Sequence, residues 1–429
     1  MLCLLVVIIT LLAACGQTAT PSPAGSSNGD ATTSPNTSSS GNDTAAPQEG
    51  TQGGSKNEAQ EAADPVRKQL EQLSLDEKVG QMILAGVQGT TLDVQAKQMI
   101  KDQKVGGVIF YANNVTTLKG TAAFVQSIKQ ANQSNPVPML MSVDQEGGKV
   151  SRMPDTVEAI PSNRIVGKTN DPALAEQMGA LLARQIKLAG FNVDFAPVLD
   201  INSNPQNPVI GDRSFGTTAD LVTRMGLAEM KGLRQEGIIP VVKHFPGHGD
   251  TSVDSHLDLP VVNKTEKQLA KLEWIPFQAA VKDQAEAVMV AHILFPKVDP
   301  DYPASLSSVI IGEHLRGKFN YKGVVITDDL SMGAIAKNYS LEKATVATVQ
   351  AGSDILLVAH SYERAKTIFD TLIRAVKSGK IKESRIDESV YRILTLKQQY
   401  KLADDQQATG EVKQLNADIR SWRKQLDAR

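Results

Sequence analysis

The chain has 429 residues, of which 41% are hydrophobic and 21% charged, and its formal net charge is -2 at pH 7. This length suits one large globular domain or two ordinary ones, and a near-neutral charge without a basic run argues against nucleic acid as a partner. Both cysteines, Cys3 and Cys15, lie in the first fifteen residues, so the body of the chain has no cysteine for a disulfide or a thiolate metal site.

An apolar run opens the chain at residues 2–12, and the small residues Ala13 and Ala14 follow it before Cys15. A run of this length is typical of a signal-peptide core and is too short to span a bilayer comfortably. The segment from Leu12 to Gly16 resembles a bacterial lipoprotein processing site. This resemblance implies that residues 1–14 are a signal peptide and that Cys15 becomes the lipidated first residue. An ordinary secretory signal with a chance cysteine is the alternative.

Residues 16–62 consist mainly of Ser, Thr, Gly, Asn, Pro and Ala and offer almost nothing to bury. Such a composition predicts a disordered tether over residues 15–62. A lipid anchor followed by a long polar linker would hold the folded body at the outer face of the cytoplasmic membrane. We therefore expect an extracytoplasmic protein.

The body alternates short apolar runs with helical patterns. A helix begins at Asp64-Pro65, residues 74–77 have capping-box spacing, and residues 172–188 form a helix with Asp171 as N-cap. We predict strands near residues 82–85, 107–110, 139–143, 192–196, 238–242, 287–291, 323–327 and 354–358. This α/β alternation favours a single (β/α)8 TIM-type barrel over residues 63–404.

Two amphipathic segments, residues 362–377 and 384–401, would complete the outer layer of the barrel. The remainder, residues 405–429, is charged and only weakly periodic. We interpret it as a solvated tail helix and assign it no function.

Polar residues stand where the predicted strands end, which is where such barrels carry their active sites. An acidic residue directly after an apolar strand is costly to bury unless it is paired or functional. For any one of these residues, a helix cap or a salt bridge is an equally good explanation, but several at one rim favour a site. The residues are Asp144, Glu146, Arg152, Asp194, Asp200, Lys243, His244, His292, Asp328 and Asp329.

Three of the six histidines lie in the loop after the fifth predicted strand. Asp254 and His256 are two residues apart there, so the carboxylate can reach the imidazole, fix its tautomer and favour its protonated form. His256 is therefore a candidate proton donor. Carboxylates together with a carboxylate-primed histidine suit glycoside cleavage, in which one group protonates the leaving oxygen and an opposed carboxylate attacks the anomeric carbon.

The run from Lys243 to Asp250, Lys-His-Phe-Pro-Gly-His-Gly-Asp, followed by Asp254-Ser255-His256, resembles the signature of the bacterial β-N-acetylglucosaminidases of glycoside hydrolase family 3. The runs at residues 144–148, with Arg152, and at residues 327–332 match the same family. The likeness extends over residues 65–400, which is nearly the whole body.

The resemblance implies a retaining enzyme in which Asp328 is the nucleophile and Asp254 and His256 form the acid/base dyad. It also implies that five residues bind the terminal sugar: Asp144, Arg152, Arg213, Lys243 and His244. Family members need no metal or other cofactor and release N-acetylglucosamine from peptidoglycan fragments or related glycans. We expect a monomer that acts on a glycan or muropeptide and contacts the membrane through Cys15.

Several alternatives stay open in the sequence. Asp329 is expected to cap or support the loop because adjacent strand residues point to opposite faces, and His248 and Asp250 are expected to hold the loop in shape. His292 fits a pocket residue and a satisfied buried histidine equally well. Phosphate could replace water in the second step, which would make the protein a phosphorylase.

Two further alternatives belong to other classes of protein. A metal hydrolase could use His244, His248, His256 and Asp254, but their spacing matches no helical ligand pair and Lys243 would repel a cation. A non-catalytic sugar-binding lipoprotein would also carry an anchor and a tether, but it needs no paired nucleophile and acid.

Overall fold

The computed structural model describes residues 64–359 and 361–429 of the chain. The predicted signal peptide (residues 1–14), the lipidation at Cys15 and the tether (residues 15–62) lie outside the described residues. No helix in the described part of the chain combines the length and the apolar character needed to cross a membrane.

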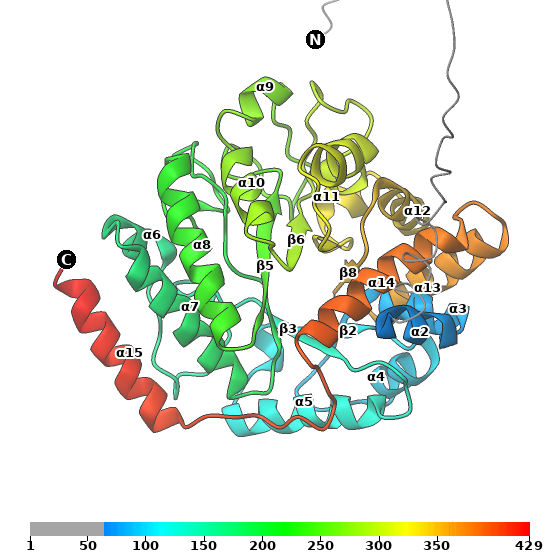
Figure 1. Ribbon diagram of the computed structural model, residues 1–429, viewed down its shortest axis with the longest axis horizontal. Helices are drawn as coiled ribbons and strands as arrows, with labels where there is room; N and C mark the ends of the chain where they lie inside the picture. The colour runs from blue at the N-terminus through cyan, green and yellow to red at the C-terminus, as the bar shows by residue number, and fades with distance from the viewer. Residues whose placement is uncertain (1–63, 360) are drawn as a thin grey trace, which may run out of the picture. The chain divides into compact units, whose positions relative to one another are not determined.

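Eight parallel strands form the centre of the body, in the order β7-β6-β5-β4-β3-β2-β1-β8 (Figure 1). A parallel bridge between Ile326 and Ile355 joins β7 to β8, so the sheet closes on itself. The predicted (β/α)8 barrel is therefore confirmed. The strands are β1 (Ile83–Gly86), β2 (Gly107–Phe110), β3 (Leu140–Val143), β4 (Val193–Asp194), β5 (Ile239–Phe245), β6 (Ala287–Val290), β7 (Val324–Thr327) and β8 (Leu356–Val358).

Every predicted strand has a counterpart, although several differ in length, and two of these differences concern the site. The strand expected at residues 192–196 is reduced to Val193–Asp194, and the strand expected at residues 238–242 continues to Phe245. Lys243 and His244 thus lie inside β5 rather than after it. The pairing of β5 with β6 shifts in register between Val242 and Phe245. Such an irregularity redirects side chains that would otherwise alternate between the two faces.

Helices surround the barrel, and their starts follow the capping signals in the sequence. The Oγ of Ser74 and the carboxylate of Glu77 form the reciprocal capping box, and the Asp171 side chain accepts the N–H of Ala173 at the start of α7. The helices are α2 (Pro65–Gln72), α3 (Leu75–Gln81), α4 (Val94–Gln98), α5 (Leu118–Asn132), α6 (Asn163–Lys168), α7 (Pro172–Lys187), α8 (Ala219–Gln235), α9 (Glu266–Leu269), α10 (Trp274–Lys282), α11 (Gly333–Ala336), α12 (Leu341–Ala351), α13 (Tyr362–Lys377), α14 (Glu383–Gln399) and α15 (Val412–Asp427), with a π-helical segment at Ser308–Lys318.

The last helix corrects one expectation. Residues 405–429 were expected to hold a solvated tail helix, but α15 packs against α7 and buries four apolar side chains, spaced by four, three and four residues (Figure 1). This spacing places them on one helix face, while charged residues cover the other. The buried residues are Leu415, Ile419, Trp422 and Leu426.

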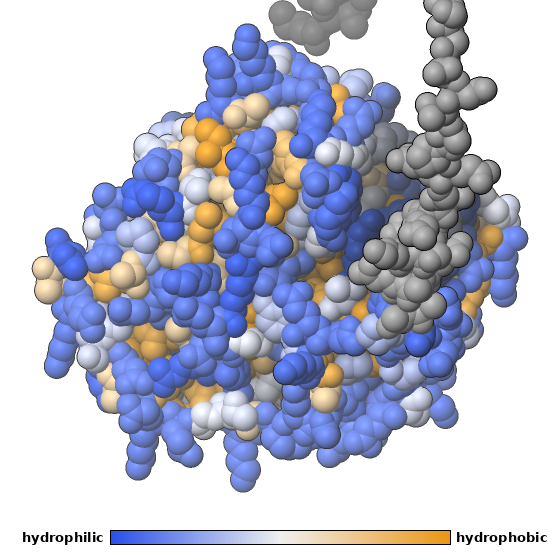
Figure 2. Space-filling view, viewed as in Figure 1, coloured by the Kyte–Doolittle hydropathy of each residue, from blue (hydrophilic) through white to orange (hydrophobic). Residues whose placement is uncertain are grey.

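A buried lysine from α14 lies at the amino-terminal end of the barrel. The Nζ of Lys397 donates to Gln81 Oε1 at 2.6 Å, to the carbonyl of Gly106 at 2.8 Å and to the carbonyl of Pro138 at 2.7 Å. These three acceptors precede β1, β2 and β3. Hydrophilic residues dominate the visible outer surface, with smaller hydrophobic patches among them (Figure 2).

Candidate active site

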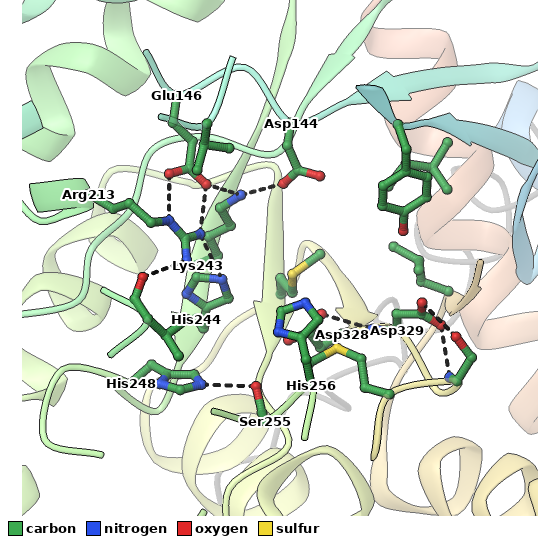
Figure 3. Close-up of a pocket in the computed structure, with 18 of the residues that line it drawn as sticks. Asp144, Glu146, Arg213, Lys243, His244, His248, Ser255, His256, Asp328 and Asp329 are labelled. Carbon is green, nitrogen blue, oxygen red and sulfur yellow. Dashed lines mark hydrogen bonds and ion pairs between the residues drawn. The ribbon is translucent and has the colours of Figure 1, made fainter. Parts of the chain in front are cut away.

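A cavity of about 410 Å³ lies at the carboxyl ends of the strands (Figure 3). All the predicted catalytic and sugar-binding residues line it except Asp254, which contacts it through its neighbour His256. The lining residues among the predictions are Asp144, Arg152, Arg213, Lys243, His244, His256 and Asp328. The barrel thus brings together side chains that lie far apart in the sequence, such as Asp144 and Asp328, which are 184 positions apart (328 − 144).

A chain of ion pairs crosses one wall of the cavity (Figure 3). The Nζ of Lys243 lies 2.5 Å from Asp144 Oδ1 and 2.6 Å from Glu146 Oε1. Arg213 donates to both oxygens of Glu146, from Nε at 2.8 Å and from Nη2 at 2.7 Å. This forked geometry fixes the guanidinium plane. Lys243 and Arg213 are therefore held in place before any ligand arrives.

Glu146 is a site residue to which the sequence analysis gave no role. Its side chain is almost fully buried, and burial alone would raise the pKa of Glu146. Arg213 and Lys243 outweigh burial and hold the pKa of Glu146 well below its ordinary value. Glu146 is thus a buried anion that balances two cations. The only indication of this role in the sequence was the position of Glu146 in the acidic run that follows β3.

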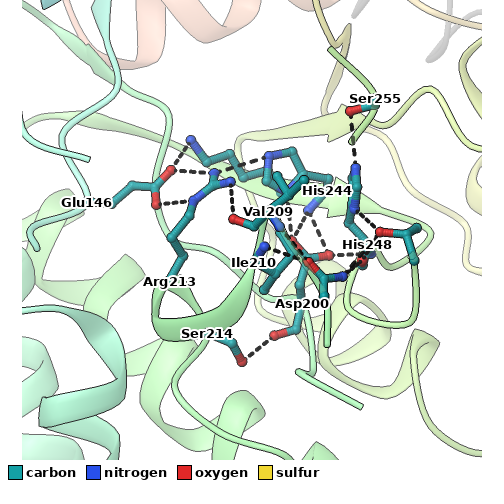
Figure 4. Close-up of polar contacts among 12 residues, drawn as sticks. Glu146, Asp200, Val209, Ile210, Arg213, Ser214, His244, His248 and Ser255 are labelled. Atoms are coloured by element: carbon teal, nitrogen blue, oxygen red, sulfur yellow. Dashed lines mark hydrogen bonds and ion pairs between the residues drawn. The ribbon is translucent and has the colours of Figure 1, made fainter. Parts of the chain in front are cut away.

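His244 is oriented from behind by Asp200 (Figure 4). Its Nδ1 lies 2.6 Å from Asp200 Oδ2, and the other carboxylate oxygen of Asp200 accepts the N–H of His248 at 2.6 Å. Burial would raise the pKa of Asp200, but His244 and His248 lower it below its ordinary value. An anionic Asp200 keeps the Nδ1 proton on His244 and turns Nε2 toward Arg213, 3.5 Å away.

Arg152 presents an unused donor. Its main-chain N–H donates to Gln145 Oε1 at 2.7 Å, whereas its buried Nε has no hydrogen-bond partner among the described residues. Buried donors without a partner are uncommon in folded proteins, and one beside a cavity is available to a ligand oxygen.

Asp328 follows β7 directly. Its N–H donates to the carbonyl of Val290 at 2.9 Å, and its Oδ1 accepts the N–H of Asp329 at 2.8 Å. Burial would raise the pKa of Asp328, but the imidazoles of His292 and His244 and this hydrogen bond hold it below its ordinary value. Asp328 is therefore an ionised carboxylate at the cavity wall.

Asp329 has a different set of partners. Its carboxylate accepts the N–H and the Oγ–H of Ser331, at 2.8 and 2.7 Å, and the N–H of Ala359 at 3.1 Å. It also borders the cavity. These bonds tie the loop after β7 to the end of β8, which is what a capping role requires.

The predicted pairing of Asp254 and His256 is present. Asp254 Oδ1 lies 2.8 Å from His256 Nδ1 and also accepts the main-chain N–H of His256 at 2.9 Å. The side chain of His256 is 66% exposed and that of Asp254 is 33% exposed. The acceptor at Nδ1 leaves Nε2 as the ring nitrogen that can exchange a proton with a ligand.

The loop that carries this pair is held at two points. His248 Nε2 lies 3.2 Å from Ser255 Oγ, and His248 Nδ1 lies 2.9 Å from Thr251 Oγ1. Burial and the neighbouring His244 lower the pKa of His248 to about 4, so its ring is neutral near pH 7. Asp250 pairs with Lys264 at 3.0 Å. His248 borders the cavity, but its ring nitrogens are used within the loop.

The second attachment involves Gly333, which the sequence analysis did not single out. The N–H of Gly333 donates to the carbonyl of His256 at 3.2 Å, and the N–H of Ala334 donates to the carbonyl of Ser255 at 3.1 Å. A Cβ at position 333 would come within 2.6 Å of the His256 carbonyl oxygen. A residue without a side chain therefore lets the His256 loop lie against α11.

Three predicted rim residues do not line the cavity. His292 is buried, and its Nδ1 and Nε2 contact Ser305 Oγ at 2.6 Å and the carbonyl of Asp329 at 3.0 Å, so it is a satisfied buried histidine. Asp194 is also buried and accepts the N–H of Gln145. Burial raises the pKa of Asp194 well above its ordinary value. Asp200 does not line the cavity and contacts it through His244.

A metal centre would need several ligating side chains close together. Within residues 64–359 and 361–429, no group of three or more His, Cys, Asp or Glu side chains has the geometry to hold a metal ion. His244 and His248 instead direct their ring nitrogens to the partners described above.

Over residues 74–396 the sequence matches the family model for the glycosyl hydrolase family 3 N terminal domain. The chain belongs to glycoside hydrolase family 3. It is 33% identical to a beta-hexosaminidase of Alkalilimnicola ehrlichii over 292 residues, covering 67% of this chain and 82% of that one. It is 32% identical to beta-hexosaminidase A of Pseudoalteromonas piscicida over 332 residues, covering 72% of this chain but only 56% of that longer relative.

Solved structures give the same family. A family 3 beta-N-acetylglucosaminidase from Paenibacillus sp. FPU-7 superposes with a TM-score of 0.77 at 41% sequence identity, over 82% of this chain and 68% of that one. The family 3 barrel described above is thus that of a glycoside hydrolase.

Proposed function

We propose that this family 3 protein is a retaining exo-β-N-acetylglucosaminidase. The observation that carries the proposal is the meeting of an ionised Asp328 and the Asp254–His256 pair at one cavity that Lys243 and Arg213 also line. A nucleophile, a proton donor and fixed cations for sugar hydroxyls are the parts that two-step glycoside cleavage requires. The similarity to beta-hexosaminidases supports the sugar preference.

In the first step a carboxylate oxygen of Asp328 attacks the anomeric carbon. The glycosidic bond breaks, and His256 Nε2 gives its proton to the departing oxygen while Asp254 stabilises the imidazolium through Nδ1. The sugar is then bonded to Asp328 as an ester, and His256 is neutral.

In the second step His256 Nε2 takes a proton from water. The water oxygen bonds to the anomeric carbon as the bond to Asp328 breaks, which restores the carboxylate and the imidazolium. Two inversions at the same carbon retain its configuration. A histidine suits both tasks because its ordinary pKa lies near neutrality.

The proposed sugar contacts follow from the ion pairs. Asp144 can accept from a sugar hydroxyl, and Lys243, Arg213 and the unpartnered Nε of Arg152 can donate to sugar oxygens. Because Glu146 and Asp200 already hold Arg213 and His244, little ordering remains to be done when the sugar binds.

We further propose that a lipid at Cys15 anchors the enzyme outside the cytoplasmic membrane. The processing-site pattern and the polar linker support this placement. Peptidoglycan fragments are the proposed natural substrate because an anchored exported enzyme would meet cell-wall material. The protein would act as a monomer.

A panel of nitrophenyl glycosides, assayed with and without inorganic phosphate, tests the proposal. We expect nitrophenol release from the β-N-acetylglucosaminide well above that from the β-glucoside, with free N-acetylglucosamine as the product. A sugar phosphate formed only when phosphate is present would replace hydrolysis with phosphorolysis. Sugar binding without release from any member of the panel would favour a non-catalytic sugar-binding lipoprotein.

A further inference from the structure

Helix α15 lies beyond the family match, which ends at residue 396, yet it contacts the loop that carries two of the proposed sugar-binding residues. That loop, residues 144–162, joins β3 to α6 and brings Asp144 and Arg152 to the cavity. We propose that Asn416 and Arg420 of α15 are positioning residues for this loop, and that they thereby set the affinity of the cavity for the sugar. The inference rests on the proposed function.

Asn416 holds the loop backbone with both ends of its amide. Its Oδ1 accepts the N–H of Glu158 at 2.9 Å, and its Nδ2 donates to the carbonyl of Thr156 at 2.9 Å. An amide side chain supplies an acceptor and a donor side by side. Arg420 Nη1 adds an ion pair to Glu158 Oε1 at 2.8 Å. Residues 156–158 are thus fastened to α15 by main chain and side chain together.

The helix that provides these contacts is itself fixed to the barrel. Its apolar face is buried, and Trp422 Nε1 donates to the carbonyl of Leu174 in α7 at 3.2 Å. Asp418 pairs with Arg184 of α7 at 2.6 Å. Figure 1 shows α15 running alongside α7. Asn416 and Arg420 therefore hold the loop from a rigid support.

A buried line of amides leads from the contact point to the cavity. The carbonyl of Glu158 accepts from Gln185 Nε2 at 2.7 Å, Gln185 Oε1 accepts from Gln145 Nε2 at 2.7 Å, and Gln145 Oε1 accepts the N–H of Arg152 at 2.7 Å. Gln185 and Gln145 are 1% and 0% exposed. Because each donor in this line already has its acceptor, the network favours one arrangement.

The two ends of the loop are also tied to each other, since the N–H of Gly148 donates to the carbonyl of Ile160 at 2.8 Å. A shift at residues 156–158 is therefore carried toward Arg152 both along the backbone and through Gln185 and Gln145. The Nε of Arg152 is buried beside the cavity and unpartnered, so its position decides whether it reaches a sugar oxygen.

The proposed nucleophile and proton donor stand on other elements. Asp328 follows β7 and His256 lies on the loop after β5, and neither contacts residues 150–162 through a hydrogen bond in the described structure. Loosening α15 from the loop should therefore weaken sugar binding and leave the chemical step nearly unchanged. This split distinguishes a positioning role from a general loss of folding.

The test compares Asn416→Leu, Arg420→Ala and the control Lys424→Ala, an exposed residue of the same helix. For Asn416→Leu we expect KM for the nitrophenyl β-N-acetylglucosaminide to rise about tenfold with kcat within about twofold of wild type. Asn416→Gln, which keeps the amide, should recover part of the loss. Amide hydrogen exchange of residues 150–158 should be faster in Asn416→Leu and unchanged in Lys424→Ala.

An unchanged KM and unchanged exchange in Asn416→Leu would overturn the inference, and so would an equal fall in kcat and kcat/KM without rescue by glutamine. If the wild-type protein releases no nitrophenol from any glycoside, the proposed function fails instead. The exchange comparison then decides by itself whether α15 holds the loop.

Discussion

Asp328 and Asp329 are adjacent in the sequence, but their carboxylates have different partners. Asp328 Oδ1 accepts one main-chain N–H, from Asp329, whereas Asp329 accepts three hydrogen bonds from Ser331 and Ala359. The first carboxylate is thus kept available to the cavity, and the second holds the loop after β7 in shape.

The first prediction separates these two carboxylates. Asp328→Ala should lower kcat by at least about a thousandfold with the fold intact, because it removes the carboxylate on which the proposed glycosyl ester forms. Asp329→Asn should instead cost about 1–2 kcal/mol of unfolding free energy through its weakened loop bonds. Nitrophenol release and urea unfolding measure the two effects. Activity retained in Asp328→Ala would remove it from the nucleophile role.

The second prediction concerns proton donation by His256. His256→Ala should slow glycosides with poor leaving groups by about a hundredfold or more, and glycosides with activated leaving groups far less. A series of aryl glycosides of different leaving-group pKa gives the slope. Equal losses across the series would argue against proton donation.

Asp254→Asn should act in the same direction as His256→Ala, because the amide cannot stabilise the imidazolium formed at His256. A pH profile of kcat/KM for the wild type and this variant measures the change. Profiles that coincide would show that the pair does not act as a dyad.

The third prediction tests the close approach of the loop to α11. Gly333→Ala would place a Cβ within 2.6 Å of the His256 carbonyl oxygen, which is main chain and cannot rotate away. We expect kcat to fall about tenfold or more while the thermal midpoint changes little. Gly312→Ala is the matched control, since its nearest contact would be at 3.5 Å. Equal activity in the two variants would contradict the prediction.

The fourth prediction is a pH dependence of stability that arises from His248. Burial and the neighbouring His244 lower the pKa of His248 to about 4 in the folded protein, from 6.5. The unfolded chain therefore binds more protons between these values, and stability is fully present above pH 6.5 and is lost as the pH falls toward 4. The difference corresponds to about 3 kcal/mol.

His248→Gln removes the titrating group but keeps a polar atom near Ser255. Urea unfolding at several pH values between 4 and 7.5 should show a shallower dependence in this variant than in wild type. Identical slopes would mean that other groups, such as buried carboxyls, account for the acid sensitivity.

The fifth prediction addresses the proposed anchor. Cys15→Ala should move the protein from the membrane fraction to the soluble fraction of the cell envelope or the medium, because the chemistry of lipidation needs this thiol. Cys3→Ala, within the apolar run that precedes Cys15, is the control and should stay with the membrane. Fractionation and incorporation of labelled palmitate provide the readout. A membrane-bound Cys15→Ala protein would contradict the prediction.

The barrel could be predicted because a parallel strand buried on both faces leaves a continuous apolar run, and eight such runs alternate with helical segments. The strand lengths were less predictable. Lys243 and His244 are charged or polar, so the apolar run stops at Val242. The strand nevertheless continues to Phe245 across an irregularity in register, and both side chains line the cavity.

The role of Glu146 could not be read from the sequence because it depends on Arg213, which is 67 residues away and reaches it only after folding. The docking of α15 was missed for a similar reason. Its four buried apolar residues form a narrow row along one face of an otherwise charged helix. A segment with so few apolar residues resembles a solvated helix unless the surface that it packs against is known. The role of Gly333 could not be predicted, because a residue without a side chain adds nothing to a hydrophobic or polar pattern.

His256, the proposed proton donor, is exposed while the other histidines in the described part of the chain are buried, so it is open to chemical labelling. His244, His248, His292 and His314 are each less than 9% exposed, whereas the side chain of His256 is 66% exposed. Among the histidines that the structure describes, an imidazole-specific reagent should thus modify His256 first. Occupying the cavity with a sugar should slow that modification, which would report ligand binding without any substitution in the chain.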